Sequence, residues 1–530
     1  MRILPSPKLV QEKPGTLDLL QIGKWCVDDR FHVAEQVMKG YFPNGNGERT
    51  VAIEYSDRIP QEGYVLDVTP SGITIQASTL SGALYGLTSL RIHSETDLGK
   101  TIVPCVHIAD EPKLGYRGIL FDVARYFVDV AGVKRLIDLM LLHKLNVLHL
   151  HLTDDQGWRI EIKKYPLLTQ IGSKREKTNI HGWHKTDDDG TPHSGYYTQE
   201  DIRNLVQYAQ DRGITVIPEI DMPAHFMAAF AAYPWLGCRE LEGIQPAWFM
   251  GGKYPASIGW KDWNRSACIG KESTFRFIFD VIDEVFELFP APYFHIGGDE
   301  APKEEWKNCP HCQKRKQENG LRTEKELQCY FINRVYQYVK SKGKRLIGWN
   351  EVLQGNGLDK DVIVQYWTPA PDRKVAKHLR KGGNVIISKH QAFYFDMAFG
   401  QYPLKNTYTF TPKKLGIREK YLPQVLGYEG CLWAEWTPNM HKREFQLFPR
   451  TDALAEIAWS SHKLDKQEFL DRLDAFLPVL DALGVNYAER DVAEISNRRE
   501  RAKITYAWYH YDQDMELRRN EELKAKKGKA

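Results

Sequence analysis

The chain has 530 residues, with 72 lysines and arginines against 69 aspartates and glutamates, which gives a formal net charge of +3. This near balance excludes the global basic field of a nucleic-acid-binding protein and the acidic, solvated chain of a disordered one. Hydrophobic residues make up 42% and charged residues 27%, as in ordinary globular proteins. We therefore expect a folded protein with no nucleic-acid partner.

The beginning of the chain, Met-Arg-Ile-Leu-Pro-Ser-Pro, lacks the apolar stretch of a signal peptide. No run of about 18 apolar residues, the length needed to span a membrane, occurs anywhere in the sequence. The 8 cysteines are sparse and irregularly spaced, which favours reduced thiols over a disulfide framework. These features predict a cytoplasmic protein without a membrane span, and nothing in the sequence indicates its oligomeric state.

Residues 1–111 are predicted to form a small α+β domain. Between residues 64 and 76, apolar and polar residues alternate on both sides of Pro70-Ser71-Gly72, whose residue types favour a turn, so a β-hairpin is expected. Leucines recur at helical spacing over 81–90, which predicts a helix. Strands followed by a helix are typical of a sheet covered by one helical layer.

After residue 112, short apolar runs alternate with amphipathic helical stretches. The expected strands are 118–123, 147–152, 215–220, 293–296, 345–348, 362–366, 384–388 and 425–433. The expected helices include 133–143, 201–211, 274–288, 324–340 and 374–381, and the second of them follows a capping-box pattern at Thr198-Gln-Glu-Asp201. Eight such units predict the α/β class and a (β/α)8 TIM barrel over residues 112–490. The alternative, an open doubly wound sheet, has no glycine-rich phosphate turn to support it.

Two long segments, 153–197 and 221–272, follow the second and third expected strands. Loops after the carboxyl ends of barrel strands build the active site in this fold, so both segments are expected near the chemistry. Residues 491–530 are charged and predict a helical C-terminal extension. We expect one helix over 498–520, docked through Tyr506, Trp508 and Tyr509, with a frayed basic end.

The strongest candidate for a catalytic site is His295-Ile-Gly-Gly-Asp-Glu300, at the end of the fourth strand. Two glycines leave the backbone uncrowded before the neighbouring carboxylates of Asp299 and Glu300. Like charges this close raise the pKa of at least one carboxyl, and a general acid must stay protonated near neutral pH. The alternative is that both acids only favour the dipole of the next helix.

A second cluster, Pro218-Glu-Ile-Asp-Met-Pro-Ala-His225, ends the third strand. Glu219 and Asp221 are two residues apart and therefore share one face of a strand. His225 follows the turn, and an aspartate–histidine couple beside Glu300 is expected to tune its proton affinity.

A third cluster, His149-Leu-His-Leu-Thr-Asp-Asp-Gln-Gly-Trp158, ends the second strand and places Asp154 at the rim. His149 and His151 lie on one strand face, and we interpret them as hydrogen-bonded polar residues of the barrel interior. On the first strand, Arg117 has two open interpretations: it donates hydrogen bonds to a substrate, or it bridges a core carboxylate.

Three tryptophans fall at the ends of later strands, at Trp349, Trp367 and Trp433. Scattered tryptophans usually belong to a core, but in a barrel these three would face a single cavity. Aromatic walls with charged groups at the base suit a sugar, whose C–H faces pack on rings while its hydroxyls bind charges.

The segment Cys309-Pro-His-Cys312 is typical of a redox motif or of half a zinc site. A single pair without a second one nearby is a weak signal. Its place after Trp306 in a helical stretch favours a role in packing, without a metal or redox function.

Together these motifs resemble glycoside hydrolase family 20, the β-N-acetylhexosaminidases. The matching segments are Arg117-Gly118, 151–158, 218–225, 295–300, 348–351, Tyr394-Phe-Asp-Met397 and Leu432-Trp-Ala-Glu435. They span the barrel from about 113 to 460, and the hairpin domain resembles the small domain that precedes the barrel in this family. The resemblance implies an exo-acting retaining enzyme that removes terminal β-linked GlcNAc or GalNAc from a glycan or glycoconjugate, without a metal or cofactor. It also implies substrate-assisted catalysis, in which the 2-acetamido oxygen of the sugar attacks the anomeric carbon and forms an oxazolinium.

The resemblance also implies a role for each site residue. Glu300 would be the acid and then the base, while Asp299 would orient the acetamido N–H and Tyr394 would bind the acetamido oxygen. Asp154, His225 and Asp221 would support Glu300. The residues expected to bind the sugar are Arg117, Trp349, Trp367, Asp396, Trp433 and Glu435.

Two other functions compete with this one. A metal-dependent barrel hydrolase would use His149-x-His151 as ligands, but the sequence contains no His-Glu-x-x-His motif. A non-catalytic sugar-binding protein is disfavoured by the intact Asp299, Glu300, Tyr394 and tryptophan set.

Overall fold

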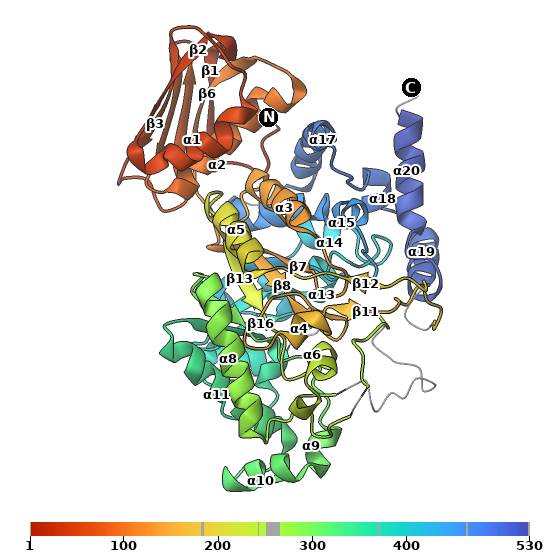
Figure 1. Ribbon diagram of the computed structural model, residues 1–530. Helices are drawn as coiled ribbons and strands as arrows, with labels where there is room; N and C mark the ends of the chain where they lie inside the picture. Colours follow the sequence, from red (N-terminus) through yellow and green to blue (C-terminus); the bar gives the residue numbers. More distant parts are fainter. Residues whose placement is uncertain are drawn as a thin grey trace.

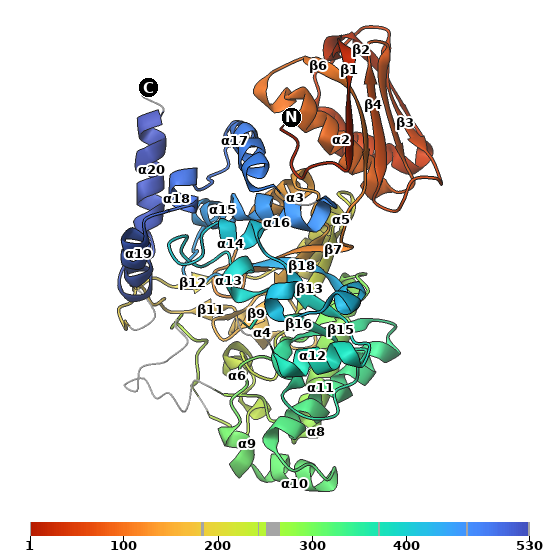
Figure 2. The same cartoon turned by 180° about the vertical axis from the view of Figure 1, so that it is seen from behind.

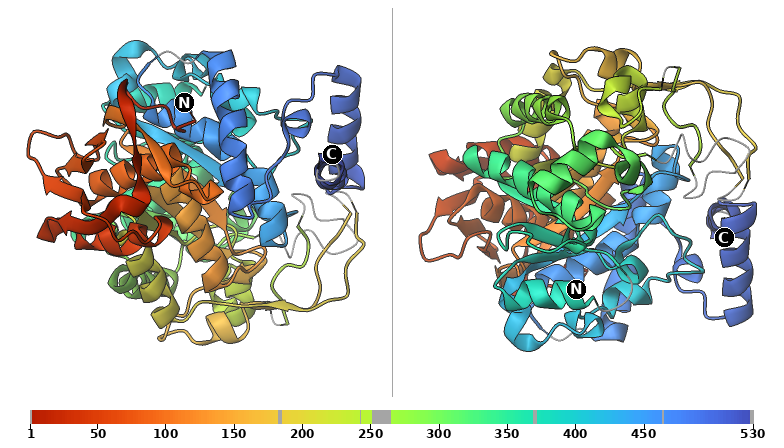
Figure 3. Two further views of the ribbon diagram at one scale, coloured as in Figure 1. Left: turned by 90° about the horizontal axis from the view of Figure 1, so that it is seen from above. Right: turned by 90° about the horizontal axis from the view of Figure 1, so that it is seen from below.

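The structure is a computed structural model that describes residues 2–181, 185–241, 243–250, 265–368, 372–462 and 465–527. A sheet domain at the N-terminal end lies against one end of a barrel, and the last helices stand on the opposite side of the molecule from that sheet (Figure 1, Figure 3). None of the described helices has the length and apolar character needed to cross a bilayer.

The N-terminal domain is a six-stranded mixed sheet in the order β1-β6-β4-β5-β3-β2. Its strands are β1 (Leu9–Asp18), β2 (Ile22–Val27), β3 (Arg49–Tyr55), β4 (Tyr64–Thr69), β5 (Gly72–Ala77) and β6 (Ile102–Asp110), and its α-helices are α1 (His32–Met38) and α2 (Leu80–Ser94). The expected hairpin is confirmed, with Thr69 of β4 paired to Gly72 of β5 across the turn. Helix α2 contacts β4 and β5 on one side and a barrel helix on the other, which explains why nearly all of its residues are buried.

The eight expected barrel strands are all present and close in the order β13-β14-β15-β16-β17-β18-β7-β8, with every pair parallel. Seen from behind, β7, β13, β16 and β18 lie in the middle of the molecule, below the N-terminal sheet (Figure 2). They are β7 (Tyr116–Asp122), β8 (Val147–His151), β13 (Thr215–Glu219), β14 (Tyr293–His295), β15 (Arg345–Trp349), β16 (Ile363–Tyr366), β17 (Val385–Ile387) and β18 (Val425–Leu432). The TIM barrel predicted from the alternation of apolar runs and helices is therefore confirmed.

Helices cover the outside of the barrel because their apolar faces pack on the strands. They include α3 (Val130–Leu142), α5 (Gln199–Gln210), α8 (Glu272–Leu288), α11 (Glu324–Ser341), α12 (Arg373–Arg380), α15 (Met440–Leu447) and α16 (Arg450–Trp459). The capping box that begins α5 is present, with the side chain of Thr198 and that of Asp201 each accepting from the other's backbone N–H. Shorter elements in the loops are β9 (Thr153–Asp154), β10 (Gly157–Trp158), α4 (Leu167–Gln170), β11 (Lys174–Arg175), β12 (His193–Ser194), α6 (Met227–Ala232), α9 (Glu304–Asn308), α10 (Pro310–Glu318), α13 (His390–Phe393) and α14 (Lys405–Tyr408).

The barrel interior is layered. An apolar layer fills the end nearest the N-terminal domain, formed by Tyr116, Val147, Ile217, Ile347, Ile363 and Ile386. Two residues further along the strands, polar side chains replace it, with His149 on β8 and Glu219 on β13 both fully buried. The layer of buried polar groups leads directly to the carboxyl ends of the strands, where the candidate site lies.

The C-terminal extension differs from the expectation. The chain after α17 (Lys466–Ala482) and α18 (Arg490–Ala493) forms two helices, α19 (Arg498–His510) and α20 (Met515–Lys527), rather than one. Docking through Trp508 is confirmed because its side chain is buried, but Tyr506 is 60% exposed. The reason is helical spacing: the buried Ile504 lies four residues before Trp508 on the same face, whereas Tyr506 projects from another face.

Candidate active site

The candidate site lies at the carboxyl ends of the barrel strands, where the last residues of neighbouring strands are in register. His151 of β8 pairs with Asp122 of β7 on one side and with Glu219 of β13 on the other, and Glu219 pairs in turn with His295 of β14. Motifs that are far apart in the sequence therefore meet at one edge of the barrel.

The turn after β14 depends on two glycines. Gly297 and Gly298 both have positive φ, and a Cβ on Gly297 would lie 1.8 Å from Oδ1 of Asp221. The same Oδ1 accepts the backbone N–H of Gly298 at 3.2 Å. The turn therefore packs directly on Asp221 and presents the next two residues, Asp299 and Glu300, to the site.

His225 joins the carboxylates of two loops. Its Nδ1 lies 3.1 Å from Oδ1 of Asp154, while its Nε2 lies 3.7 Å from Oδ2 of Asp299 and 3.8 Å from Oε2 of Glu300. Both His225 and Glu300 have a left-handed backbone, with φ of 53° and 45°, which is uncommon for non-glycine residues and concentrates at functional sites. The expected association of Asp154, Asp221 and His225 with the Asp299–Glu300 pair is therefore seen in the geometry.

Burial and mutual repulsion set the proton affinities here. Burial raises the pKa of Asp299 to about 6, with the charge of Glu300 adding to the effect and that of His225 opposing it. Burial and the charge of Asp299 hold the pKa of Asp221 well above its usual range. Although burial alone would lower the pKa of His225, the surrounding carboxylates, Asp154 foremost, raise it well above its usual value, so the ring is a cation at neutral pH.

The interior histidines form a hydrogen-bonded network below this site. His151 contacts Glu219 through Nδ1 and Asp154 through Nε2, the latter at 2.8 Å. His149 binds Glu429 through Nδ1 at 2.9 Å, and Nδ1 of His295 lies 2.8 Å from Glu219. The interpretation of His149 and His151 as interior polar residues is confirmed. Both nitrogens of His151 already bind carboxylates.

Aromatic side chains form one wall of the site. The rings of Trp367 and Tyr394 stack with centroids 5.9 Å apart, Trp433 lies 6.3 Å from Tyr394, and Trp349 lies 5.7 Å from Trp433. The three expected tryptophans and Tyr394 therefore belong to one cluster. Trp349 is fixed in place because its indole N–H donates to Oε1 of Glu219 at 3.0 Å.

A group of charged residues stands beside the aromatic wall. Burial and the nearby charge of Glu435 hold the pKa of Asp396 well above its usual range, and burial raises that of Glu435 to about 7. Arg125 lies between carboxylates: its Nη2 is 3.0 Å from Asp154 and 3.9 Å from Glu435, and its guanidinium faces the ring of Trp433. This combination of an arginine, two acids and a ring is suited to binding hydroxyl groups.

Arg117 does not lie with these residues. It is the second residue of β7, at the amino end of the barrel, where it is fully buried. Its guanidinium donates to Glu62 of the N-terminal domain at 2.8 Å and to the backbone oxygen of Lys144 at 2.9 Å. The expectation that Arg117 binds substrate is therefore wrong, and the alternative of a bridged core carboxylate is correct. The reason is position: an arginine at the start of a strand points away from the face that its end builds.

Sequence reasoning missed two residues of the site. Arg125 follows β7 in Phe-Asp-Val-Ala-Arg125, and its position just beyond the carboxyl end of the strand was the available signal. Glu351 follows β15; its Oε2 accepts the indole N–H of Trp367 at 2.9 Å. Burial, together with the charges of Asp299 and Glu300, raises the pKa of Glu351 to about 8.

Comparison with known proteins identifies the same architecture. Residues 114–462 match the family model described as "Glycosyl hydrolase family 20, catalytic domain", and residues 1–111 match that described as "Glycosyl hydrolase family 20, domain 2". A beta-hexosaminidase of Porphyromonas gingivalis is 41% identical over 471 residues, which cover 85% of this chain and 58% of that protein. A beta-hexosaminidase of Vibrio furnissii is 31% identical over 485 residues, covering 86% of this chain and 76% of that protein. This chain therefore spans somewhat more than half the length of the Porphyromonas relative.

Solved structures agree with the fold. The exo beta-N-acetylglucosaminidase of Vibrio harveyi in complex with N-acetylglucosamine has a TM-score of 0.79 and 30% identity, covering 92% of this chain and 78% of that one. The beta-N-acetylhexosaminidase of Bacteroides fragilis has a TM-score of 0.77 and 29% identity, covering 92% of this chain and 96% of that one.

Proposed function

The chain belongs to glycosyl hydrolase family 20, and on this premise we propose that it is an exo-acting β-N-acetylhexosaminidase that removes terminal β-linked GlcNAc or GalNAc with retention of configuration. The observation that carries the proposal is Oδ1 of Asp299. This oxygen is buried and has no hydrogen-bond partner among the described residues. A buried acceptor without a partner is unfavourable, and the N–H of a 2-acetamido group would satisfy it.

The arrangement of Asp299 and Glu300 favours participation of the substrate's own acetamido group. A conventional retaining pair places its carboxyls about 5–5.5 Å apart on opposite sides of the anomeric carbon. Here the two acids are consecutive in the chain, and both approach the same nitrogen of His225, at 3.7 and 3.8 Å. Two carboxyls on one side of the site cannot flank the anomeric carbon. The nucleophile that attacks C1 from the opposite side must therefore be another group. An attached acetamido oxygen is well suited, since tethered nucleophiles reach effective molarities of about 10⁵–10⁸ M.

The proposed reaction has two balanced steps. In the first, the acetamido oxygen bonds to C1 as the C1–O bond to the leaving group breaks, and Glu300 gives its proton to the departing oxygen. The carboxylate of Asp299 accepts a hydrogen bond from the acetamido N–H and stabilises the positive oxazolinium. In the second step, Glu300 takes a proton from water, the water oxygen bonds to C1, and the bond to the acetamido oxygen breaks.

The remaining residues are proposed to hold the sugar in place. Trp349, Trp367 and Trp433 would surround the acetamido methyl group and the ring face, and the hydroxyl of Tyr394 would donate to the acetamido oxygen. Asp396 and Glu435 would bind ring hydroxyls, and the guanidinium of Arg125 takes the place expected for Arg117. The Nε of Arg125 has no hydrogen-bond partner among the described residues, which leaves a buried donor for a hydroxyl.

The test compares two aryl β-glycosides that differ only in the 2-acetamido group. We expect rapid turnover of the N-acetylglucosaminide and a loss of several orders of magnitude for the glucoside, because the glucoside lacks the internal nucleophile. Equal rates on both, or a covalent glycosyl ester trapped on a carboxylate of the protein, would refute the proposed mechanism. The cytoplasmic location expected from the sequence stays a prediction.

A further inference from the structure

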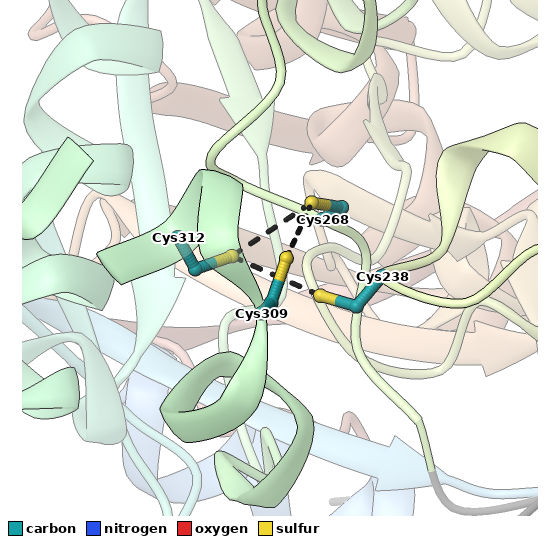
Figure 4. A group of neighbouring side chains, drawn as sticks. All are labelled: Cys238, Cys268, Cys309 and Cys312. Atoms are coloured by element: carbon teal, nitrogen blue, oxygen red, sulfur yellow. Dashed lines mark hydrogen bonds between the residues drawn. The ribbon is translucent and has the colours of Figure 1, made fainter. Parts of the chain in front are cut away.

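Four cysteines from three separate segments of the chain converge outside the candidate active site. Cys238 follows α6 and its adjoining turn, Cys268 precedes α8, and Cys309 and Cys312 stand at the start of α10 (Figure 4). Their four sulfur atoms all lie within 4.8 Å of one another. Cys268, Cys309 and Cys312 are buried, and Cys238 is partly buried. We call this group the four-cysteine cluster.

The distances in this cluster suit one tetrahedral ion. The sulfur atoms of Cys268 and Cys309 are 3.6 Å apart, those of Cys268 and Cys312 are 3.7 Å apart, and those of Cys238 and Cys312 are 3.8 Å apart. With a zinc–sulfur bond of about 2.3 Å, the edges of a regular ZnS₄ tetrahedron are about 3.8 Å long. A disulfide would bring two sulfurs to about 2 Å, and none of these pairs approaches it.

The backbone around the cluster holds the ligands in register. Gly237 and Ala267 form an isolated antiparallel bridge, so Cys238 and Cys268 each come directly after a bridged residue. A Cβ on Gly270 would lie 2.3 Å from the backbone nitrogen of Cys312, which shows how closely the segment of Cys268 packs on the first turn of α10.

We propose that the four-cysteine cluster is a structural zinc site. Binding one Zn²⁺ would displace four protons from the four thiols and leave the ZnS₄ group with a net charge of −2. Two cations lie on the same segments: the ammonium of Lys271 donates to the backbone oxygens of Trp235 and Gly237, and Nη2 of Arg315 donates to that of Gly270 at 3.1 Å. Four protein ligands leave no open position, which is typical of a structural site rather than a catalytic one.

The place of the site in the fold gives it a role. It joins the long loop after β13 to the segment that follows Asp299 and Glu300 after β14. The same two segments are joined by hydrogen bonds from Ser266 to the backbone oxygen of Pro302, at 2.9 Å, and from Trp306 to that of Ala267, at 3.0 Å. The bound ion would therefore brace the loop that presents the two catalytic acids. In the sequence only the Cys309–Cys312 pair stood out, as a weak signal without a second pair nearby, because Cys238 and Cys268 lie far from each other and from that pair in the chain.

The first test is the metal content of the full chain, produced in zinc-supplemented culture and purified without chelators or a histidine tag. Mass spectrometry of the elements is expected to find one zinc per chain. Cys312→Ser is expected to retain about a tenth of the zinc or less, whereas Cys329→Ser, which changes a buried cysteine outside the cluster, should keep it. An unchanged zinc content in Cys312→Ser would overturn the proposal.

The second test uses the unaltered protein, so that it does not depend on whether a variant folds. After zinc is removed by a chelator and replaced by Co²⁺, the visible d–d bands and sulfur-to-metal charge transfer of a tetrahedral tetrathiolate are expected. The melting temperature should fall on zinc removal and recover when zinc is added back. Protein that carries no metal after growth in zinc, that carries iron in its place, or that contains a disulfide within the cluster would each contradict the zinc assignment.

Discussion

His225 places Nε2 3.7 Å from Oδ2 of Asp299 while its Nδ1 stays 3.1 Å from Oδ1 of Asp154. A protonated imidazole between two carboxylates stabilises the ionised form of both. The charge of His225 lowers the pKa of Asp299, in opposition to burial and to Glu300, which raise it. The balance leaves Asp299 with a pKa of about 6. The proton affinity of Asp299, in the loop after β14, therefore depends on the charge of His225, in the loop after β13.

The first prediction concerns the pH dependence of turnover. In the proposed mechanism Asp299 must be ionised to stabilise the oxazolinium, so kcat/KM, which reports the pKa values of the free enzyme, should fall as the pH drops through about 6. His225→Gln removes the cation and should move this acidic limb to higher pH. The pH profile of kcat/KM on an aryl N-acetylglucosaminide measures both effects. An acidic limb that stays at the same pH in His225→Gln would contradict the electrostatic link.

The second prediction concerns stability. The pKa of Asp299 is about 6 in the folded protein and about 4 in an unfolded chain, so the folded state binds more protons between these values. The stability contribution of Asp299 therefore falls as the pH rises through this window. Asp299→Asn should be more stable than the parent at pH 7, by on the order of 2–3 kcal/mol, and the difference should vanish near pH 4.

Thermal unfolding at both pH values tests this second prediction, and activity gives an independent readout. Asp299→Asn should lose roughly 10²-fold or more in kcat because the amide carries no negative charge to stabilise the intermediate. Asp361→Asn, at an exposed position that pairs with Lys360, is the matched control and should change neither quantity by much. A less stable Asp299→Asn at pH 7 would show that the buried charge is not destabilising.

The third prediction concerns Glu300, which we propose as the general acid. Glu300→Gln removes the transferable proton, and its cost should follow the leaving group: about 10²–10⁴-fold in kcat where the departing oxygen needs a proton, and much less for an activated phenol. A series of aryl N-acetylglucosaminides with phenols of different acidity provides the measurement. If all members lost the same factor, Glu300 would not be the proton donor to the leaving group.

The fourth prediction separates the two arginines of β7 and its loop. Arg125→Lys keeps the charge but loses the planar set of donors beside Asp154 and Glu435, so kcat/KM should fall by roughly 10–100-fold with the fold intact. Arg117→Lys should instead lower the free energy of unfolding by about 2–4 kcal/mol, because buried hydrogen bonds to Glu62 and Lys144 are lost. Its kcat/KM should stay close to that of the parent, and the reverse pattern would contradict the assignment of the two residues.

The fifth prediction gives the C-terminal extension a role in the site. Glu516 of α20 is buried and accepts the backbone N–H groups of Phe399, at 2.9 Å, and Gly400, at 2.7 Å, in the loop that follows Tyr394 and Asp396. Glu516→Ala should lower stability by about 2–3 kcal/mol. It should also lower kcat/KM about tenfold, because a displaced loop would move Tyr394 and Asp396 away from the positions in which we propose that they bind the sugar.

The control for this variant is Glu521→Ala, at an exposed position on the same helix. Kinetics and thermal unfolding of both variants test whether the C-terminal extension contributes to the site or only to stability. A Glu516→Ala protein with reduced stability but unchanged kcat and KM would mean that the extension only supports the fold.

Periodicity and residue chemistry determined most of the architecture. The eight strands, the N-terminal hairpin and the capping box at Thr198 were all predictable, because strand and helix periods and turn residues act locally. Asp299, Glu300 and His225 were predictable as candidates because each follows an apolar strand of a parallel barrel, and the carboxyl ends of such strands always meet.

Only the tertiary structure decided which side chains meet across long stretches of chain. It placed Arg117 against Glu62 of the N-terminal domain and Arg125 beside Asp154 at the site, and neither partner is close in sequence to its arginine. It brought Cys238 and Cys268 to Cys309 and Cys312, and it divided the C-terminal segment into two helices. These features arise from packing between distant segments, and packing leaves no local periodic signal in a sequence.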